Sequence, residues 1–258
     1  MVQERIFPAS RPAIPGLDYF ADWRPARGVS GDHIDYFEMR DGQLGLAVGH
    51  ISSQGLPAAL LNPFLHCMVR TWRYARNSSP RELVRSVHEW FYEICPDNCH
   101  ATLFVATYDP ASGELRYVNA GHEPPVVLQK NGAHYRTVFL EASGPVIGML
   151  RRSAYRENVV SLRPGDVVAA YSDGLCETRN RSGEAWGWPR FIERMEGCAG
   201  QKARDIVEGI MQATETFAGG APQSDDATLW VGRVEDVANL PRWKPESAAL
   251  VGFEGAAA

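Results

Sequence analysis

The feature that most constrains the fold is a series of hairpin signals, in which two short runs of strand-forming residues flank a glycine-containing turn. A connection this short favours antiparallel pairing of the two strands. The four turns fall at Asp41-Gly42, residues 110–113, Asn131-Gly132 and residues 163–165. Four hairpins favour antiparallel sheet and argue against a doubly wound parallel fold, which alternates strands with helices.

Sequence periodicity extends this prediction to the rest of the chain. We expect strands over residues 17–23, 33–39, 43–48, 102–108, 114–119, 125–129, 135–139, 155–162, 166–171 and 228–234. We expect helices over residues 56–75, 81–94, 188–196 and 202–217. Successive strands with helices in separate groups are typical of an α+β fold.

Composition limits the partners and the compartment. The chain has 258 residues, a net charge of −5 and a pI near 5.8, so it lacks the basic character typical of nucleic-acid-binding proteins. No apolar run approaches the roughly 20 residues that a membrane span needs, and no signal peptide is recognisable. Five cysteines, an odd number, favour reduced thiols. We expect a cytoplasmic protein that contacts neither nucleic acid nor membrane.

We expect a single domain between two tails. Residues 1–16 contain three prolines and little periodicity, which is typical of a lead-in segment. Residues 236–258 drift into proline, alanine and glycine, so we expect a loosely ordered C-terminal tail. The domain itself is predicted to span residues 17–235.

Residues 44–62 (LGLAVGHISSQGLPAALLN) combine an apolar strand, a loop bounded by Gly49 and Gly55, and a helix that begins near Pro57. Loop carbonyls and helix amides converge where a strand feeds a helix in this way, so ions and phosphates are often bound there. The loop contains no carboxylate. Its shape therefore predicts an ion site, while its residues leave the chemistry open.

Three aspartates follow or precede apolar strands and adjoin small residues: Asp32, Asp173 and Asp225. Carboxylates at strand ends are the ligands that Mg²⁺ and Mn²⁺ prefer. Two such ions roughly 3.5–4 Å apart can generate a hydroxide and hold a phosphoryl group. Each segment alone is equally typical of an ordinary turn or loop, so the three gain meaning only when taken together.

Six segments in order resemble the metal-dependent protein phosphatase (PPM) family, in particular its bacterial branch typified by SpoIIE and RsbU. The resemblance covers about residues 15–235. The segments are residues 27–32 (RGVSGD), 49–61, 117–125 (YVNAGHEPP), 162–166 (LRPGD), 171–174 (YSDG) and 224–228 (SDDAT).

The resemblance implies a fold of two packed antiparallel sheets flanked by helices. It also implies a pair of Mn²⁺ or Mg²⁺ ions that activate water to hydrolyse phosphoserine or phosphothreonine. Asp32, Asp173 and Asp225 match metal-binding and catalytic aspartates of the family, whereas Asp226 is not expected to touch the metal. The substrate implied for this branch is a phosphorylated STAS-type anti-sigma-factor antagonist, and a sensor domain often precedes the phosphatase.

The match fails at the loop that holds the metal-bridging aspartate in the family. His50 occupies that position here, and Ile51 follows where the family uses a backbone carbonyl as a ligand. A neutral imidazole offers one lone pair and no charge, so it cannot bridge two dications as a carboxylate does. We therefore expect one or two ions held by Asp32, His50, Ile51, Asp173 and Asp225, with the second site altered.

Three functions are compatible with this departure. The first is an active phosphatase with a reduced or altered metal centre. The second is a catalytically impaired pseudophosphatase that binds a phosphoprotein, and the third is a structural or signal-transmitting module, for which a homodimer through the helix after residue 56 is one arrangement. We favour the first because the other acids and residues 119–122 (NAGH) are present.

Other conspicuous side chains have simpler interpretations. His122 suits a structural hydrogen bond near a sheet end at least as well as proton transfer. His33 should point away from Asp32 along its strand and lie at the surface. Core packing is the simplest expectation for His66, Cys67, Cys176, Trp186 and Trp188.

Overall fold

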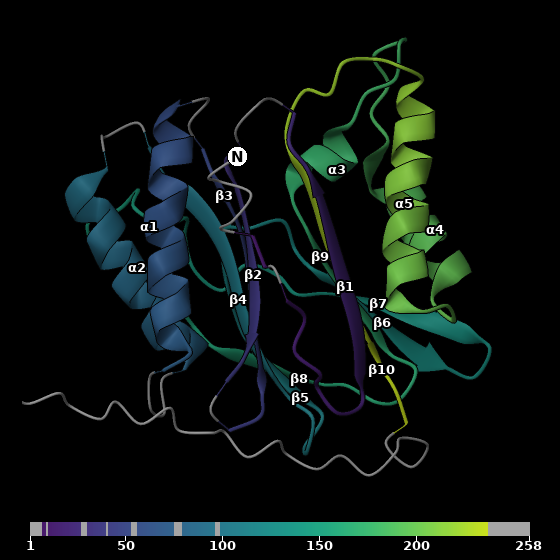
Figure 1. The fold of residues 1–258 in the computed structure, drawn as a ribbon, viewed down its shortest axis with the longest axis horizontal. Helices are drawn as coiled ribbons and strands as arrows, with labels where there is room; N and C mark the ends of the chain where they lie inside the picture. Colours follow the sequence, from purple (N-terminus) through teal and green to yellow (C-terminus); the bar gives the residue numbers. More distant parts are fainter. Residues whose placement is uncertain are drawn as a thin grey trace, which may run out of the picture.

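The computed structural model describes residues 7–8, 10–26, 30–39, 41–52, 56–74, 79–95 and 99–236. Two five-stranded sheets lie face to face, and helices cover the outer face of each (Figure 1). All strand pairs within the sheets are antiparallel. The predicted α+β class with two packed antiparallel sheets is confirmed.

The first sheet has the order β1-β10-β9-β6-β7. Its strands are β1 (Leu17–Arg24), β10 (Ala227–Val234), β9 (Val167–Tyr171), β6 (Val126–Asn131) and β7 (His134–Phe139). The second sheet has the order β2-β3-β4-β5-β8. Its strands are β2 (Asp32–Glu38), β3 (Leu44–Ile51), β4 (Ala101–Asp109), β5 (Glu114–Ala120) and β8 (Asn158–Ser161).

Helices form the outer layers. The second sheet is covered by α1 (Leu56–Trp72) and α2 (Pro80–Ile94), and the first by α3 (Asp173–Glu177), α4 (Gly187–Cys198) and α5 (Ala203–Ala218) (Figure 1). A capping box fixes the start of α2: Ser79 accepts from the Glu82 backbone N–H, and the Glu82 carboxylate accepts from that of Ser79. Of the described helices, only the short α3 was not predicted from periodicity.

Three of the four predicted hairpins are confirmed, and the fourth is wrong. The strands β8 and β9 flank the turn at residues 163–165, but they belong to different sheets. The first of them pairs with β5, whereas the second pairs with β10 and β6. This turn therefore carries the chain from one sheet to the other.

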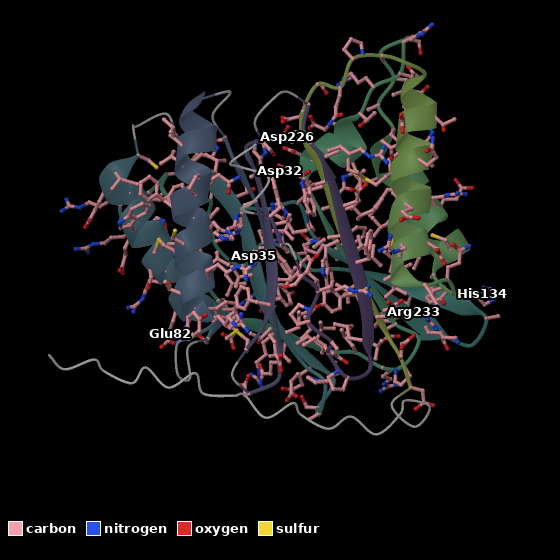
Figure 2. The ribbon with its side chains drawn as sticks, in the orientation of Figure 1. Asp32, Asp35, Glu82, His134, Asp226 and Arg233 are labelled. Carbon is pink, nitrogen blue, oxygen red and sulfur yellow. The ribbon has the colours of Figure 1, made fainter. Side chains whose placement is uncertain are left out.

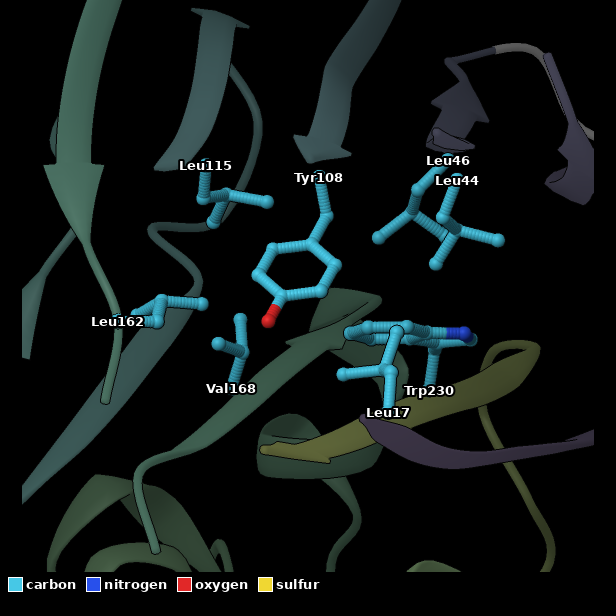
Figure 3. Close-up of a pocket in the computed structure, with 8 residues that line it drawn as sticks. All are labelled: Leu17, Leu44, Leu46, Tyr108, Leu115, Leu162, Val168 and Trp230. Carbon is cyan, nitrogen blue, oxygen red and sulfur yellow. The ribbon is translucent and has the colours of Figure 1, made fainter. Parts of the chain in front are cut away.

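The interior between the sheets is apolar and closely packed. Leucine, valine and aromatic side chains from both sheets meet there, and a cavity of only about 10 Å³ remains among them (Figure 3). Leu46 of β3 and Trp230 of β10 line this cavity from opposite sheets. Burial of these side chains joins the two sheets and so fixes how their ends meet.

The described part of the lead-in segment packs against this core. Phe7 and Ile14 are buried, and the Phe7 ring stacks on Trp23 with 4.6 Å between ring centroids. Residues 237–258, where a loose tail was expected, lie outside the described residues. Within the described residues, no helix is both long and apolar enough to cross a membrane.

Truncation of Leu46 tests whether this interface dominates stability. Leu46 is 2% exposed, so Leu46→Ala should lower the free energy of unfolding by about 2 to 5 kcal/mol through lost burial and a new cavity. Leu150 is 50% exposed, and Leu150→Ala should change the free energy of unfolding by no more than about 0.5 kcal/mol. Chemical denaturation measures both variants, and equal effects would contradict this description of the core.

Candidate metal centre

The predicted site residues gather where the strands of the two sheets end together. Asp32 begins β2 and pairs in register with His50 near the end of β3. Asp173 follows the end of β9, and Asp225 precedes β10. Asp32 and Asp226 lie together at this end of the sandwich, while Asp35 lies further along β2 beside α1 (Figure 2). Packing of the two sheets thus brings together residues that are far apart in sequence.

Asp32 is buried, and both of its carboxylate oxygens are engaged. The Nδ1 atom of His50 donates to Oδ1 at 2.8 Å, and the hydroxyl of Thr228 donates to Oδ2 at 2.6 Å. The Asp32 side chain is only 1% exposed. Each oxygen keeps a second lone pair, but the Asp32 carboxylate is held by protein partners on both sides.

His50 carries a proton at neutral pH. Burial is the largest single effect on its pKa and lowers it, but the hydrogen bond and the charge of Asp32 act in the opposite direction. The charges of Asp173 and Asp225 add to this, and together these effects raise the pKa of His50 to about 9. The surroundings of His50 thus favour a positively charged ring.

Asp173 and Asp225 are held side by side by a close backbone contact. A Cβ atom at Gly174 would lie 2.1 Å from the backbone oxygen of Asp226, so only glycine allows α3 to begin this near the segment before β10. One oxygen of Asp173 accepts from the Gly174 N–H at 2.8 Å, and one oxygen of Asp225 accepts from the Asp226 N–H at 2.8 Å. Both aspartates are partly exposed.

Asp226 has a structural role, as expected. Its two oxygens accept from the backbone N–H groups of Ala26 at 2.7 Å and Gly31 at 2.8 Å. Ile51 ends β3, and its N–H donates to the carbonyl of Gly31 at 3.1 Å. These bonds fix the segment around residue 31 against both sheets. Residues 53–55 of the adjoining loop lie outside the described residues.

Asp173 and Asp225 are the two partly exposed carboxylates of this site that would hold a hard divalent cation. Among the described residues, no group of three or more histidine, cysteine, aspartate or glutamate side chains is arranged to hold a metal. Magnesium, however, is often held by only one or two carboxylates, with water and substrate phosphate completing its shell. Asp173 and Asp225 supply two such carboxylates.

Two residues that contact Asp32 were not singled out from the sequence. Thr228 lies in the SDDAT segment, and its hydroxyl contact with Asp32 depends on the pairing of the sheets. Asn62 of α1 donates from Nδ2 to the backbone carbonyl of Asp32 at 2.5 Å. A buried asparagine within an apolar helix face is the signal that could have indicated it.

His33 is buried, so the prediction of a surface position is wrong. It is 1% exposed, and its Nδ1 lies 3.1 Å from Oδ1 of Asn62. Alternation does place His33 on the opposite face from Asp32, but α1 covers that face. Burial lowers the pKa of His33 to about 3, with His66 adding to the effect, so the ring is neutral.

The remaining conspicuous side chains mostly follow expectation. His122 is buried and bonded to Thr102, with 3.0 Å between Nδ1 and the hydroxyl, which supports a structural role. The packing predictions are confirmed for Cys176, Trp186 and Trp188. Cys67 is exposed, so its predicted packing is wrong, because it lies on the face of α1 that points away from the sheet. His66 is half-buried, 3.7 Å from Asp35.

Comparison with known proteins identifies the family. The sequence model of the family "Stage II sporulation protein E (SpoIIE)" matches residues 40–235. The chain belongs to the SpoIIE family. Its fold and the order of its site residues agree with this membership.

Two curated relatives show how far the similarity to SpoIIE-family proteins extends. Protein IcfG of Synechocystis sp. is 26% identical over 256 residues, which cover 88% of this chain and 39% of IcfG. Phosphoserine phosphatase RsbU of Bacillus subtilis is 28% identical over 200 residues, which cover 75% of this chain and 54% of RsbU. The chain therefore spans about half or less of the length of these relatives.

Solved structures support the same SpoIIE-type fold. The SiaA-PP2C domain of Pseudomonas aeruginosa superimposes with a TM-score of 0.74 at 20% identity, covering 84% of this chain and 86% of that one. The RsbU and RsbW domains of Rv1364c from Mycobacterium tuberculosis give 0.69 at 27% identity, covering 87% of this chain and 61% of that one. PP2C-family phosphatases are metal-dependent, and this chain is related to them.

The protonation of His50 can be measured directly in the presence of a chelator that removes divalent ions. Because its pKa is raised from 6.5 to about 9, the stability that it contributes is complete below pH 6.5 and is lost as the pH rises through 9. An NMR titration of the His50 ring should give a midpoint near 9, and Asp32→Asn should lower it. A parent midpoint at or below 6.5 would show that the ring is not held as a cation.

Proposed function

We propose that this SpoIIE-family domain is a serine/threonine protein phosphatase of bacterial signalling that uses one divalent cation, Mn²⁺ or Mg²⁺. The observation that carries the proposal is that the backbones next to Asp173 and Asp225 are in close contact and both side chains stay partly exposed, whereas Asp32 is buried against His50 and Thr228. Two carboxylates with water suffice to hold one such ion.

Electrostatics also favours an ion at this position. A phosphoserine group carries close to two negative charges at neutral pH, and like charges repel strongly in a partly buried pocket. Asp173 and Asp225 would exclude the substrate unless a cation offset their charge. When bound, the ion also supplies a Lewis acid that polarises the phosphoryl group and lowers the pKa of water.

In this proposal Asp32 and His50 act as a pair. Asp32 holds the imidazolium in place through Nδ1, and the other ring nitrogen then carries a second N–H donor. That positive charge favours the substrate phosphate and opposes a second metal ion. Replacement of a carboxylate by an imidazolium changes the local charge by two units, so the site differs from a bridged pair in electrostatics as well as in ligand count.

The proposed substrate is a phosphorylated STAS-type anti-sigma-factor antagonist in the cytoplasm. One relative, RsbU, is named as a phosphoserine phosphatase, and the Rv1364c structure contains an RsbU and an RsbW domain. These names support a partner in regulatory signalling.

A second candidate is a catalytically impaired pseudophosphatase that binds a phosphoprotein. The observation that favours it is the protonated His50 at the bridging position. The same metal-free site would have to accept a phosphate beside two carboxylates, which is why we place this function second.

Phosphatase assays on the parent and three variants test the proposal. With Mn²⁺ and a phosphorylated STAS-domain protein, the parent should show slow hydrolysis and Asp173→Asn none, because the ion loses one of its two carboxylates. His50→Asp should raise the rate on the order of 100-fold by restoring a bridging carboxylate and a second ion. Asp41→Asn, at the hairpin turn between β2 and β3, removes a carboxylate outside the site and should leave the rate unchanged.

If the parent shows no hydrolysis and His50→Asp restores it, the domain is a pseudophosphatase and the proposal is wrong. Hydrolysis by the parent that persists in Asp173→Asn would show that the reaction does not depend on this site.

The number of ions gives a test that is independent of activity. Calorimetric titration with MnCl₂ should show one site in the parent, none in Asp173→Asn and two in His50→Asp, because the bridging carboxylate is restored only in the last. Two equal sites in the parent would contradict the exclusion of a second ion by His50.

A further inference from the structure

A basic groove lies at the other end of the sandwich, between the β6–β7 hairpin and the edge strand β8 of the opposite sheet. Its volume is about 510 Å³, and its lining includes Gln129, Lys130, Arg136, Ser161, Arg163 and Asp166. The five-residue strand β9 runs from this groove to the metal centre, so about 17 Å of strand separates the two sites. Figure 2 labels His134, at the tip of the hairpin, well away from Asp32 and Asp226.

Asp166 positions two of the three basic residues of the groove, Lys130 and Arg163. Its carboxylate accepts from the backbone N–H of Lys130 at 2.8 Å and from that of Arg163 at 2.9 Å. Asp166 is buried, and the two bonds hold the β6 edge against the turn that enters β9. The side chains of Lys130 and Arg163 consequently line one groove although they are far apart in sequence.

The backbone around Asp166 also leaves room for the Lys130 side chain. A Cβ at Gly165 would lie 2.6 Å from Cδ of Lys130, and Gly165 has a φ of +92°. The lysine stem thus runs over a residue that only glycine suits, both for its conformation and for the contact. Arg136 joins from β7, where it pairs in register with Gln129.

The three basic side chains of this groove, Lys130, Arg136 and Arg163, outnumber its one carboxylate, Asp166. In the part of the chain that the structure describes, none of Lys130, Arg136 and Arg163 forms an ion pair. The one acid in the lining, Asp166, has both oxygens engaged by backbone N–H groups. Three unpaired cations in one concavity of a chain with a net charge of −5 form a local anion-attracting field.

We propose that this groove binds a small organic molecule through a phosphate or diphosphate group. Two guanidinium groups present planar pairs of donors and the lysine adds a point charge, a combination suited to tetrahedral dianions. Gln129 and Ser161 add neutral hydrogen-bonding groups at the rim. The volume exceeds that of an isolated phosphate and falls in the usual range for small-molecule sites, and Val159 and Val160 supply an apolar wall for the rest of the ligand.

Calorimetric titration of the full chain with sodium pyrophosphate in chelator tests the groove with the metal centre silent. The parent should bind, and the double variant Lys130→Gln/Arg163→Gln should bind at least about tenfold more weakly, because each charge-assisted hydrogen bond is worth more than a neutral one. Arg151→Gln/Arg152→Gln removes the same charge from exposed residues outside the groove and should leave the affinity unchanged. Arg136→Gln, an exposed strand-edge change, weakens binding without disturbing the Asp166 contacts.

Asp173→Asn should bind pyrophosphate as tightly as the parent, which separates this site from the metal centre whether or not the domain is a phosphatase. Failure of the parent to bind would overturn the proposal. Equal losses in the groove variant and the surface variant would also overturn it, because they would show general charge attraction. Citrate serves as a polyanion that has no phosphoryl group. If citrate binds the parent as tightly as pyrophosphate does, the groove is not specific for phosphoryl groups and the proposal is wrong.

Discussion

The cross-strand pair of Asp32 and His50 is the interaction on which the site depends. A carboxylate with almost no exposed surface is strongly disfavoured as a charge unless a cation or several donors offset the loss of water. In this chain the offset comes from within the protein, through His50 on the neighbouring strand and Thr228 on the opposite sheet. Asp32 and His50 lie on neighbouring strands of the second sheet, and the hydroxyl of Thr228 links this pair to the first sheet where the strands of both sheets end.

Much of the architecture could be predicted from local patterns. Alternation located the strands, and the turns correctly predicted three hairpins because strand pairing across a tight turn is a local property. The fourth failed because a Pro-Gly turn looks the same whether the next strand pairs with the previous one or crosses to another sheet. That choice is made by β5 and β10, which are distant in sequence. The prediction of a surface position for His33 was wrong for a related reason. Alternation assigns a residue to one face of the sheet, but only the packing of α1 shows that this face is buried.

The candidate site was predictable in its acids and not in its contacts. The order of the motifs indicated Asp32, Asp173 and Asp225, and the substitution at His50 could be read directly from the sequence. Whether Asp32 faces a metal or another side chain depends on atoms from β3, α1 and β10, so Asn62 and Thr228 were not found. The raised pKa of His50 likewise comes from three surrounding acids that outweigh the effect of burial, and only the assembled fold brings them together.

The contact of Gly174 with the segment before β10 has a consequence for how such a site can vary. The separation of Asp173 and Asp225 is set by two stretches of main chain in van der Waals contact, with no side chain between them. Side chains around these two aspartates can change while the spacing of the two backbone segments stays the same. A site built on main-chain contact can thus exchange its electrostatics and keep its dimensions.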